Sequence, residues 1–305
     1  MRARLQLLLI PAALALLLAP PAASARHAGA DNPCASNAQV ERLGLICPDL
    51  RMRAPFDIYM DRSGGRKLLR SGNSIDSMGP GPAELRGRRT AARTMKAKQR
   101  VKLRGGGRKS FATGAKLKFK HIPGQGGYWK FRNAARFELW RLDAGGFRTE
   151  RVRKGRKQVY CLRDLQHTHP DAKGSPSRPV YPGCNQNPRK RRVTLGTSSG
   201  WSDVYPASYH EQWIDVTDIG REGCYAYVHI ADPGDRIHEH RERNNEASTV
   251  VRLGRNGSFR GICNRRDRGV SAAQQGDGSP PPGLDPYVNP DTGDEEYPEE
   301  PGGGY

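Results

Sequence analysis

Residues 200–219 of the chain are GWSDVYPASYHEQWIDVTDI, and residues 223–245 are GCYAYVHIADPGDRIHEHRERNN. The second stretch alternates two kinds of side chain: Tyr225, Tyr227 and His229 on one side, and Ala226, Val228 and Ile230 on the other. A period of two predicts a β-strand with two different faces. This stretch therefore predicts a fold built from β-strands.

Similar alternation or β-branched and aromatic enrichment predicts strands elsewhere in the chain, from residue 49 onward and at 116–121, 131–142, 151–163, 212–216, 224–231 and 247–253. Helix propensity competes at 131–142, but the alternation in RFELWRL favours a strand there. No long amphipathic helix is required. We expect an all-β, antiparallel β-sandwich with long loops over residues 48–254.

The N-terminal 25 residues predict a signal peptide. Two arginines precede an apolar run, and Ala23-Ser24-Ala25 has the small-residue pattern of a cleavage site. No later segment approaches the ~20 apolar residues that a spanning helix needs. We therefore expect a secreted protein without a transmembrane segment, cleaved near Ala25.

Six cysteines in an exported chain predict three disulfides. The sequence alone allows about 15 connectivities. Among these, pairing of sequence neighbours predicts the bonds Cys34–Cys47, Cys161–Cys184 and Cys224–Cys263. The chain has no CxxC motif, which gives little support to a thiol-redox or zinc-ribbon protein.

Charge is unevenly distributed along the chain. The net charge is +20, from 51 Lys and Arg against 31 Asp and Glu, yet no basic residue follows Arg268, where eight acids occur. Without the two arginines of the signal and this tail, residues 26–268 hold 49 basic and 23 acidic residues. Such a surface attracts polyanions. Acidic cell-wall polymers, anionic lipid headgroups and extracellular nucleic acid are the candidates for an exported protein.

Composition divides the rest of the chain into segments. Residues 26–47 form a leader closed by two cysteines, and residues 255–268 form a closing segment. Residues 86–120 carry 14 Lys or Arg and no acid, which predicts a mobile basic loop. This segment lacks the interleaved aromatic residues that stack on bases, so binding of nucleic acid through it would be nonspecific. Residues 269–305, rich in Pro, Gly and acids, predict a disordered tail.

Several motifs resemble the lysyl oxidase family, and especially its bacterial members. They are GPGPAEL at 79–85, RFEL at 136–139, GRKQVYCLRD at 155–164, GWSDVY at 200–205, QWIDVTDI at 212–219 and Glu239 with Asn244-Asn245. The resemblance implies copper and a lysyl-tyrosylquinone, a cofactor made from one lysine and one tyrosine of the chain. It assigns the lysine role to Lys157 and the tyrosine role to Tyr205. Without it, Lys157 would be interpreted as surface charge and Tyr205 as a loop anchor.

The resemblance also locates the copper ligands, a His-x-His pair just before the RFEL segment. The corresponding positions hold Tyr128 and Lys130, around Trp129. Tyrosine is a poor copper ligand at neutral pH, and an ammonium group repels a cation. His121 lies nearby, and His167 and His169 have the i, i+2 spacing of a ligand pair if the chain is extended there. The alternative for these two histidines is an ordinary polar loop.

Two functions follow. The first is a secreted, non-catalytic lysyl oxidase-like protein that binds anionic envelope or extracellular polymers and holds no cofactor. The second is a copper-dependent amine oxidase acting on protein lysines or primary amines, which would release aldehyde, ammonia and hydrogen peroxide. The replaced ligands and the basic charge favour the first; Lys157 and Tyr205 favour the second.

Overall fold

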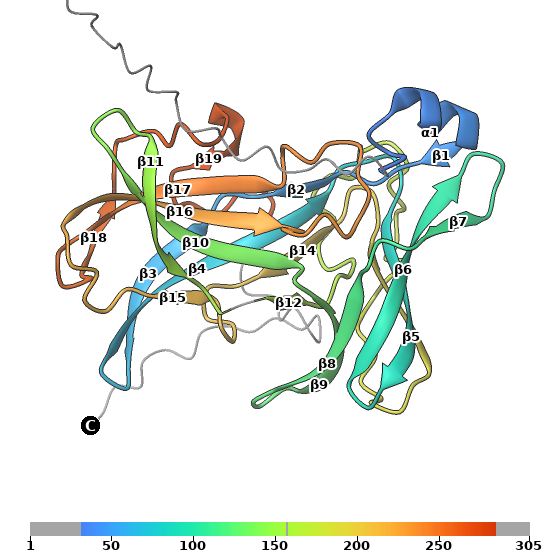
Figure 1. Cartoon of the computed structure of the whole chain (residues 1–305), viewed down its shortest axis with the longest axis horizontal. Helices are drawn as coiled ribbons and strands as arrows, with labels where there is room; N and C mark the ends of the chain where they lie inside the picture. The colour runs from blue at the N-terminus through green and yellow to red at the C-terminus, as the bar shows by residue number, and fades with distance from the viewer. Residues whose placement is uncertain (1–31, 157, 285–305) are drawn as a thin grey trace, which may run out of the picture. The chain divides into compact units, whose positions relative to one another are not determined.

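The computed structural model describes residues 32–156 and 158–284, and within them the strands form three sheets of eight, six and five members (Figure 1). Described strand pairs are antiparallel, except for one short parallel pair near the C-terminal end. The predicted all-β fold is confirmed. The predicted signal peptide and the last part of the predicted tail lie outside the described residues. No described helix is long and apolar enough to span a membrane.

The six-stranded sheet contains the strand that the alternation of residues 224–231 predicted. In order, its members are β11 (Arg148–Lys154), β10 (Ala135–Leu142), β16 (Gly223–Ala231), β17 (Glu246–Leu253) and β18 (Phe259–Ile262), with β19 (Gln275–Gly276) also paired to β17. The two faces of β16 are both buried. Tyr225 and Tyr227 enter the main core, whereas Ala226, Val228 and Ile230 pack in a separate apolar cluster.

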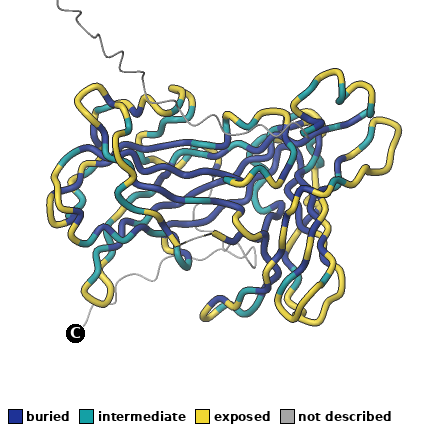
Figure 2. Tube along the Cα trace, in the orientation of Figure 1, coloured by how far each residue is buried: buried dark blue, intermediate teal, exposed yellow. Residues whose placement is uncertain are grey.

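The five-stranded sheet is organised around β4 (Arg66–Ser77), which lies under the six-stranded sheet in Figure 1. Its partners are β2 (Leu50–Met52), β3 (Phe56–Ser63), β14 (Ser202–Tyr205) and β15 (Trp213–Asp215). The Tyr227 hydroxyl donates to the Leu69 carbonyl across the two sheets, at 3.4 Å. Because both faces of β4 are covered, its second half is buried without interruption, as the dark trace in Figure 2 shows.

The eight-stranded sheet corrects one prediction. Its path is β12 (Val159–Tyr160), β9 (Gly126–Arg132), β8 (Lys116–Ile122), β6 (Thr94–Leu103), β5 (Ala83–Ala91) and β13 (Arg192–Thr197), and β1 (Leu45–Ile46) and β7 (Arg108–Phe111) also pair with β6. The basic segment 86–120, predicted as a loop, therefore forms most of this sheet. Its charges alternate with Met95, Ala97 and Val101, which are buried, so each strand has one basic and one apolar face.

The leader predicted for residues 26–47 is folded where it is described. It contains β1 and the helix α1 (Asn37–Leu43), which Ser36 caps through its side chain and Gly44 ends in the left-handed region. The disulfide Cys34–Cys47 packs with Leu45 and Val101 of the sheet. All six cysteines are described, and the bonds Cys161–Cys184 and Cys224–Cys263 complete the pairing that the sequence suggested.

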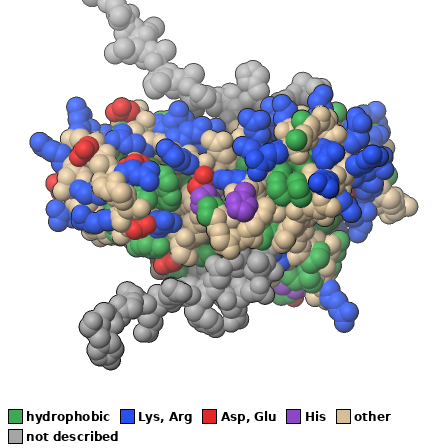
Figure 3. All heavy atoms as spheres, turned by 90° about the horizontal axis from the view of Figure 1, so that it is seen from below, with side chains coloured by type: hydrophobic (Ala, Val, Ile, Leu, Met, Phe, Trp, Pro, Cys, Tyr) green, Lys and Arg blue, Asp and Glu red, His purple; other side chains and the backbone are tan. Residues whose placement is uncertain are grey.

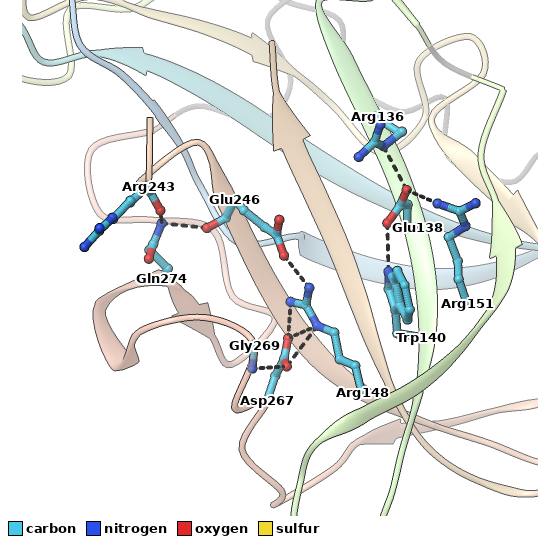
Figure 4. Close-up of polar contacts among 10 residues, drawn as sticks. All are labelled: Arg136, Glu138, Trp140, Arg148, Arg151, Arg243, Glu246, Asp267, Gly269 and Gln274. Atoms are coloured by element: carbon cyan, nitrogen blue, oxygen red, sulfur yellow. Dashed lines mark hydrogen bonds and ion pairs between the residues drawn. The ribbon is translucent and has the colours of Figure 1, made fainter. Parts of the chain in front are cut away.

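The tail predicted to be disordered from residue 269 is ordered as far as it is described. Residues 269–284 include a 3-10 turn, η1 (Ala272–Gln274), and β19. Figure 4 shows the contacts that hold this segment: Arg148 donates to Asp267, and the Gln274 amide donates to the Glu246 carbonyl at 2.7 Å. Composition missed this order because a few polar contacts, together with the packing of Leu284 against Phe56 and Val204, fix the segment.

Candidate functional site

Tyr205, the predicted quinone tyrosine, ends strand β14 and is fully buried. It is paired in register with Asn73 of β4. Its hydroxyl oxygen accepts a hydrogen bond of 2.8 Å from the backbone N–H of Cys161. The segment that contains the predicted lysine therefore contacts Tyr205 through Cys161, four residues after Lys157. Lys157 itself lies outside the described residues.

Two further tyrosines pack against the Tyr205 ring. Edge-to-face contacts join it to Tyr160, with ring centroids 4.4 Å apart, and to Tyr209, at 5.2 Å. The Tyr160 hydroxyl donates to the Asn73 side-chain oxygen at 3.2 Å, which also accepts from Gln212 at 2.8 Å. Burial, and then the negative charge of Asp203, raise the pKa of Tyr160 well above its ordinary value. Tyr160 is therefore a neutral phenol at physiological pH.

Lys130 is the most unusual residue of this cluster, because its whole side chain is buried. Its Nζ lies 2.9 Å from the Tyr209 hydroxyl oxygen. The same nitrogen stands 5.3, 5.6 and 6.0 Å from the ring centroids of Tyr209, Tyr128 and Tyr205. Aromatic faces and a hydroxyl acceptor compensate a buried ammonium group for part of its lost hydration. We call Lys130 with these three tyrosines the tyrosine cage.

The sequence period of β9 explains why Lys130 enters the cage. Side chains two residues apart point to the same side of a strand, so Tyr128 and Lys130 share one face. Trp129 points the other way, where it meets Phe119 edge-to-face and donates from Nε1 to the Asn187 carbonyl at 2.9 Å. The Tyr128 hydroxyl donates to the Gln125 carbonyl at 2.8 Å. Of the two positions that sequence motifs assigned to lost metal ligands, Lys130 thus lies beside Tyr205, the position assigned to the quinone, and Tyr128 lies beside Lys130.

His121, suggested as a remaining ligand, is not brought into the cage. It lies on β8, where it pairs in register with Gly127 and is exposed. Paired residues of an antiparallel ladder point to the same side, so His121 shares the Trp129 side of the sheet and not the Lys130 side.

His167 and His169, suggested as a relocated ligand pair, are engaged by different partners. The His167 ring stacks on Trp201 with centroids 4.5 Å apart, and its Nε2 lies 2.7 Å from the Ser175 hydroxyl. His169 contacts Asp76 through Nε2 at 3.2 Å. Burial opposes ionisation of Asp76, but the His169 hydrogen bond and the Arg53 charge together lower its pKa.

A buried histidine that the motif comparison did not single out is His229 of β16. Its ring stacks on Phe137 with centroids 3.8 Å apart, and Nε2 lies 3.2 Å from the Ser71 hydroxyl. Burial lowers the pKa of His229 well below its ordinary value, so the imidazole is neutral. The alternation of β16 placed His229 correctly on the tyrosine face, but its partners come from β4 and β10.

The residues of the cage do not fit a type-2 copper ion. Copper(II) is held by imidazole lone pairs; an ammonium group and a phenol whose proton is donated to a carbonyl stand here instead. Over residues 32–156 and 158–284, no group of three or more His, Cys, Asp or Glu side chains is arranged to hold a metal ion. A pocket of about 750 Å³ lies between the β10–β11 turn and residues 264–275, and Tyr205 is not among the residues that line it.

Sequence reasoning missed Tyr160, Tyr209, Asn73 and Gln212. The sequence signals for them were local: Tyr160 precedes Cys161, Tyr209 follows Tyr205 by four residues, and Gln212 begins the QWIDVTDI motif. Their contact with Tyr205 depends on the register of β4, β12 and β14, which motifs do not reveal.

A comparison with protein families matches residues 125–259 to the family described as lysyl oxidase. The matched region contains the tyrosine cage and the segments around residues 157 and 205. Comparison with curated proteins found no match.

Proposed function

Because residues 125–259 belong to the lysyl oxidase family, we propose that this chain is a secreted lysyl oxidase-like protein without a competent copper site, which binds anionic polymers. The family depends on copper and lysyl-tyrosylquinone, and its members act outside the cytoplasm. The three disulfides fit an oxidising compartment.

The observation that carries the loss of copper chemistry is the position of Lys130. Its Nζ occupies the space between three tyrosine rings, one of them Tyr205, and bonds to the Tyr209 hydroxyl. A divalent cation placed there would meet a positive charge with no lone pair to offer. Oxidation of Tyr205 to a quinone requires a metal, so we infer that Tyr205 stays an ordinary tyrosine.

Burial supports the same conclusion. Tyr205 and Lys130 are both fully buried, and Tyr160 and Tyr209 cover the Tyr205 ring. An amine substrate has to reach the quinone ring in order to condense with it. A ring that already fills its place in the core with close edge-to-face contacts serves the packing of the fold.

The binding role rests on charge. Figure 3 shows a face on which Lys and Arg side chains far outnumber Asp and Glu, in agreement with the net charge of +20. Such a field attracts polyanions and repels cationic, lysine-rich substrates. Both effects favour a binding protein for acidic polymers over an oxidase of basic proteins.

A paired assay tests this proposal on the secreted, disulfide-bonded protein. We expect no hydrogen peroxide from primary amines after incubation with copper, and retention on an anionic polymer that weakens as salt is added. Amine-dependent peroxide release that a carbonyl reagent abolishes would contradict the first half. Failure to bind any polyanion at low salt would contradict the second.

The alternative is a copper-dependent primary-amine oxidase that uses Lys157 and Tyr205. The observation in its favour is the hydrogen bond from the Cys161 N–H to the Tyr205 hydroxyl, which ties the segment after Lys157 to the tyrosine. It requires copper ligands other than those at the family positions.

A further inference from the structure

The eight-stranded sheet arranges basic side chains in rows that run across its strands. Arg192 of β13 is in register with Arg88 of β5, Arg88 with Lys96 of β6, and Lys96 with Lys116 of β8. Paired residues of an antiparallel sheet project to the same side. Four cations from four strands therefore form one row, spaced by about 4.8 Å and spanning about 14 Å.

A second, shorter row lies beside the first. Arg86 pairs with Lys98, two residues along each strand from Arg88 and Lys96. Lys118 flanks the first row on its other side, where it pairs with Thr94 of β6. The six basic residues of the two rows and Lys118 beside them are all exposed: Arg86, Arg88, Lys96, Lys98, Lys116, Lys118 and Arg192. We call this set the basic face.

The described part of the chain supplies no counter-charge to the basic face. Glu84 is the only acid in the sequences of β5, β6, β7, β8 and β13, and it is already used by Arg100, Arg108 and the Tyr181 hydroxyl. Within the part of the chain that the structure describes, no ion pair involves any of the seven residues. Like charges directly opposite each other destabilise a sheet, so a ligand that supplies counter-charges along the rows would relieve this repulsion.

The rest of the basic face indicates what kind of polyanion fits. The other exposed side chains on these strands' outer side include Thr90 and Thr194, and the nearby aromatic Phe119 is buried against Trp129. Binding of single-stranded nucleic acid usually adds stacking of bases on exposed aromatic rings, and sugar rings also need an apolar surface. A face without such rings suits a polymer that presents charge alone.

We propose, resting on the binding role proposed above, that the basic face is a binding site for a linear phosphate polymer that lies across strands β13, β5, β6 and β8. Guanidinium groups bind phosphate through two parallel N–H hydrogen bonds, and ammonium groups contribute point charges. Successive phosphates of the polymer face successive cations of a row.

The test uses long-chain inorganic polyphosphate as the probe and the mature, disulfide-bonded protein. The row variant Arg88→Gln/Lys96→Gln/Lys116→Gln/Arg192→Gln is compared with a control that removes four exposed charges elsewhere, Arg221→Gln/Arg243→Gln/Arg255→Gln/Arg260→Gln. Both variants have the same net charge. Affinity is measured over a series of salt concentrations, and circular dichroism confirms that both variants fold.

We expect the row variant to lose about tenfold or more in affinity, and the slope of log K against log salt to become shallower by about 3, as four phosphate contacts disappear. The control variant should keep the parent slope. Equal weakening of both variants would overturn the basic face as the site while leaving a general affinity for polyanions intact. Tighter binding of single-stranded DNA or a sulfated glycan of equal charge would overturn the choice of polymer. No binding of any polyanion by the parent would overturn the binding role as well.

Discussion

Lys130 shows how one side chain reverses the chemistry of a position. On a strand whose alternate residues face a buried tyrosine, an imidazole would offer a lone pair to a metal, whereas an ammonium group offers a charge of the same sign. The cage accepts that charge through one hydroxyl and three ring faces. In this chain these neighbours surround the amino group of Lys130.

Removing the hydroxyl that Lys130 contacts should destabilise the protein. Tyr209→Phe deletes an acceptor of a buried ammonium group, and hydrogen bonds to charged groups are worth about 1.5–3 kcal/mol. We expect denaturant unfolding to show a loss of about 2 kcal/mol. Tyr225→Phe serves as the control, because its hydroxyl bonds to the Arg221 carbonyl near the surface and its loss should be smaller. A Tyr209→Phe variant as stable as the parent would contradict the cage.

Restoring imidazoles on the same face should restore metal uptake. In the double variant Tyr128→His/Lys130→His, two imidazoles at i and i+2 would point toward Tyr205 without the ammonium charge. We expect copper to bind with clearly higher stoichiometry than in the parent after dialysis, measured by elemental analysis. Lys130→Met, which removes the charge but adds no ligand, is the control. Uptake no greater than in the control would mean that these two positions do not face a metal site.

At the scale of elements, the high density of Lys and Arg in residues 86–120 predicted a loop where the structure has strands of a sheet. Lys116–Ile122 could be predicted as a strand because Leu117, Phe119 and Ile122 mark its buried face. Strand β6, which pairs with it, has the same alternation, but its buried residues include Ala97 and Gln99, which carry little hydrophobic signal. The density of Lys and Arg then favoured a loop. Burial of small and polar side chains was the physical feature that composition did not capture.

The C-terminal segment depends on one buried ion cluster, so its loss should be measurable. Asp267 is fully buried and accepts from Arg148 and from the Gly269 N–H. Asp267→Ala would leave the Arg148 guanidinium largely buried with Glu246 as its remaining acid. Breaking a buried pair typically costs about 3–5 kcal/mol, and we expect a loss near the lower end in chemical denaturation.

The matched control for this cluster is Arg104→Ala. Its ion pair with Glu41 is exposed on both sides, and exposed pairs contribute little to stability. If the two variants lost equal stability, the cluster around Asp267 would not be what orders residues 269–284.

At the scale of the whole molecule, sequence motifs found some residues of the candidate site, whereas others depend on how the three sheets pack. The motifs grouped Tyr128, Lys130 and Tyr205, and in the structure the Lys130 Nζ lies 5.6 Å from the Tyr128 ring centroid and 6.0 Å from that of Tyr205. They missed Tyr160 and Tyr209, since contacts between three sheets depend on how those sheets pack. The histidines His121, His167 and His169 were grouped by proximity in sequence, but strand alternation and separate hydrogen-bond partners keep them apart.

Stability should depend on pH through three acids near the β16–β17 connection. Burial raises the pKa of Asp232 to about 7 and that of Glu242 to about 8, and burial with the Glu242 charge raises the pKa of Glu239 well above its ordinary value. Folded-state pKa values above the unfolded ones mean that the folded state binds more protons. Stability is therefore full below the unfolded pKa, near 4, and is lost as pH rises through about 7 to 8.

We expect the melting temperature to fall by several degrees between about pH 5.5 and pH 8.5. Glu242→Gln, which removes one ionisable partner, should flatten this dependence. A melting temperature that stays constant or rises over this range in the parent would show that these carboxyl groups ionise without cost to the fold.

The central claim is that Lys130 replaces copper chemistry and leaves Tyr205 unmodified. The most direct measurement is intact mass with peptide mapping and metal analysis of the protein secreted by its own host with copper supplied. We expect an unmodified Tyr205, an unmodified Lys157 and no stoichiometric copper. A cross-linked Lys157–Tyr205 peptide together with near-stoichiometric copper would contradict it and identify an active amine oxidase.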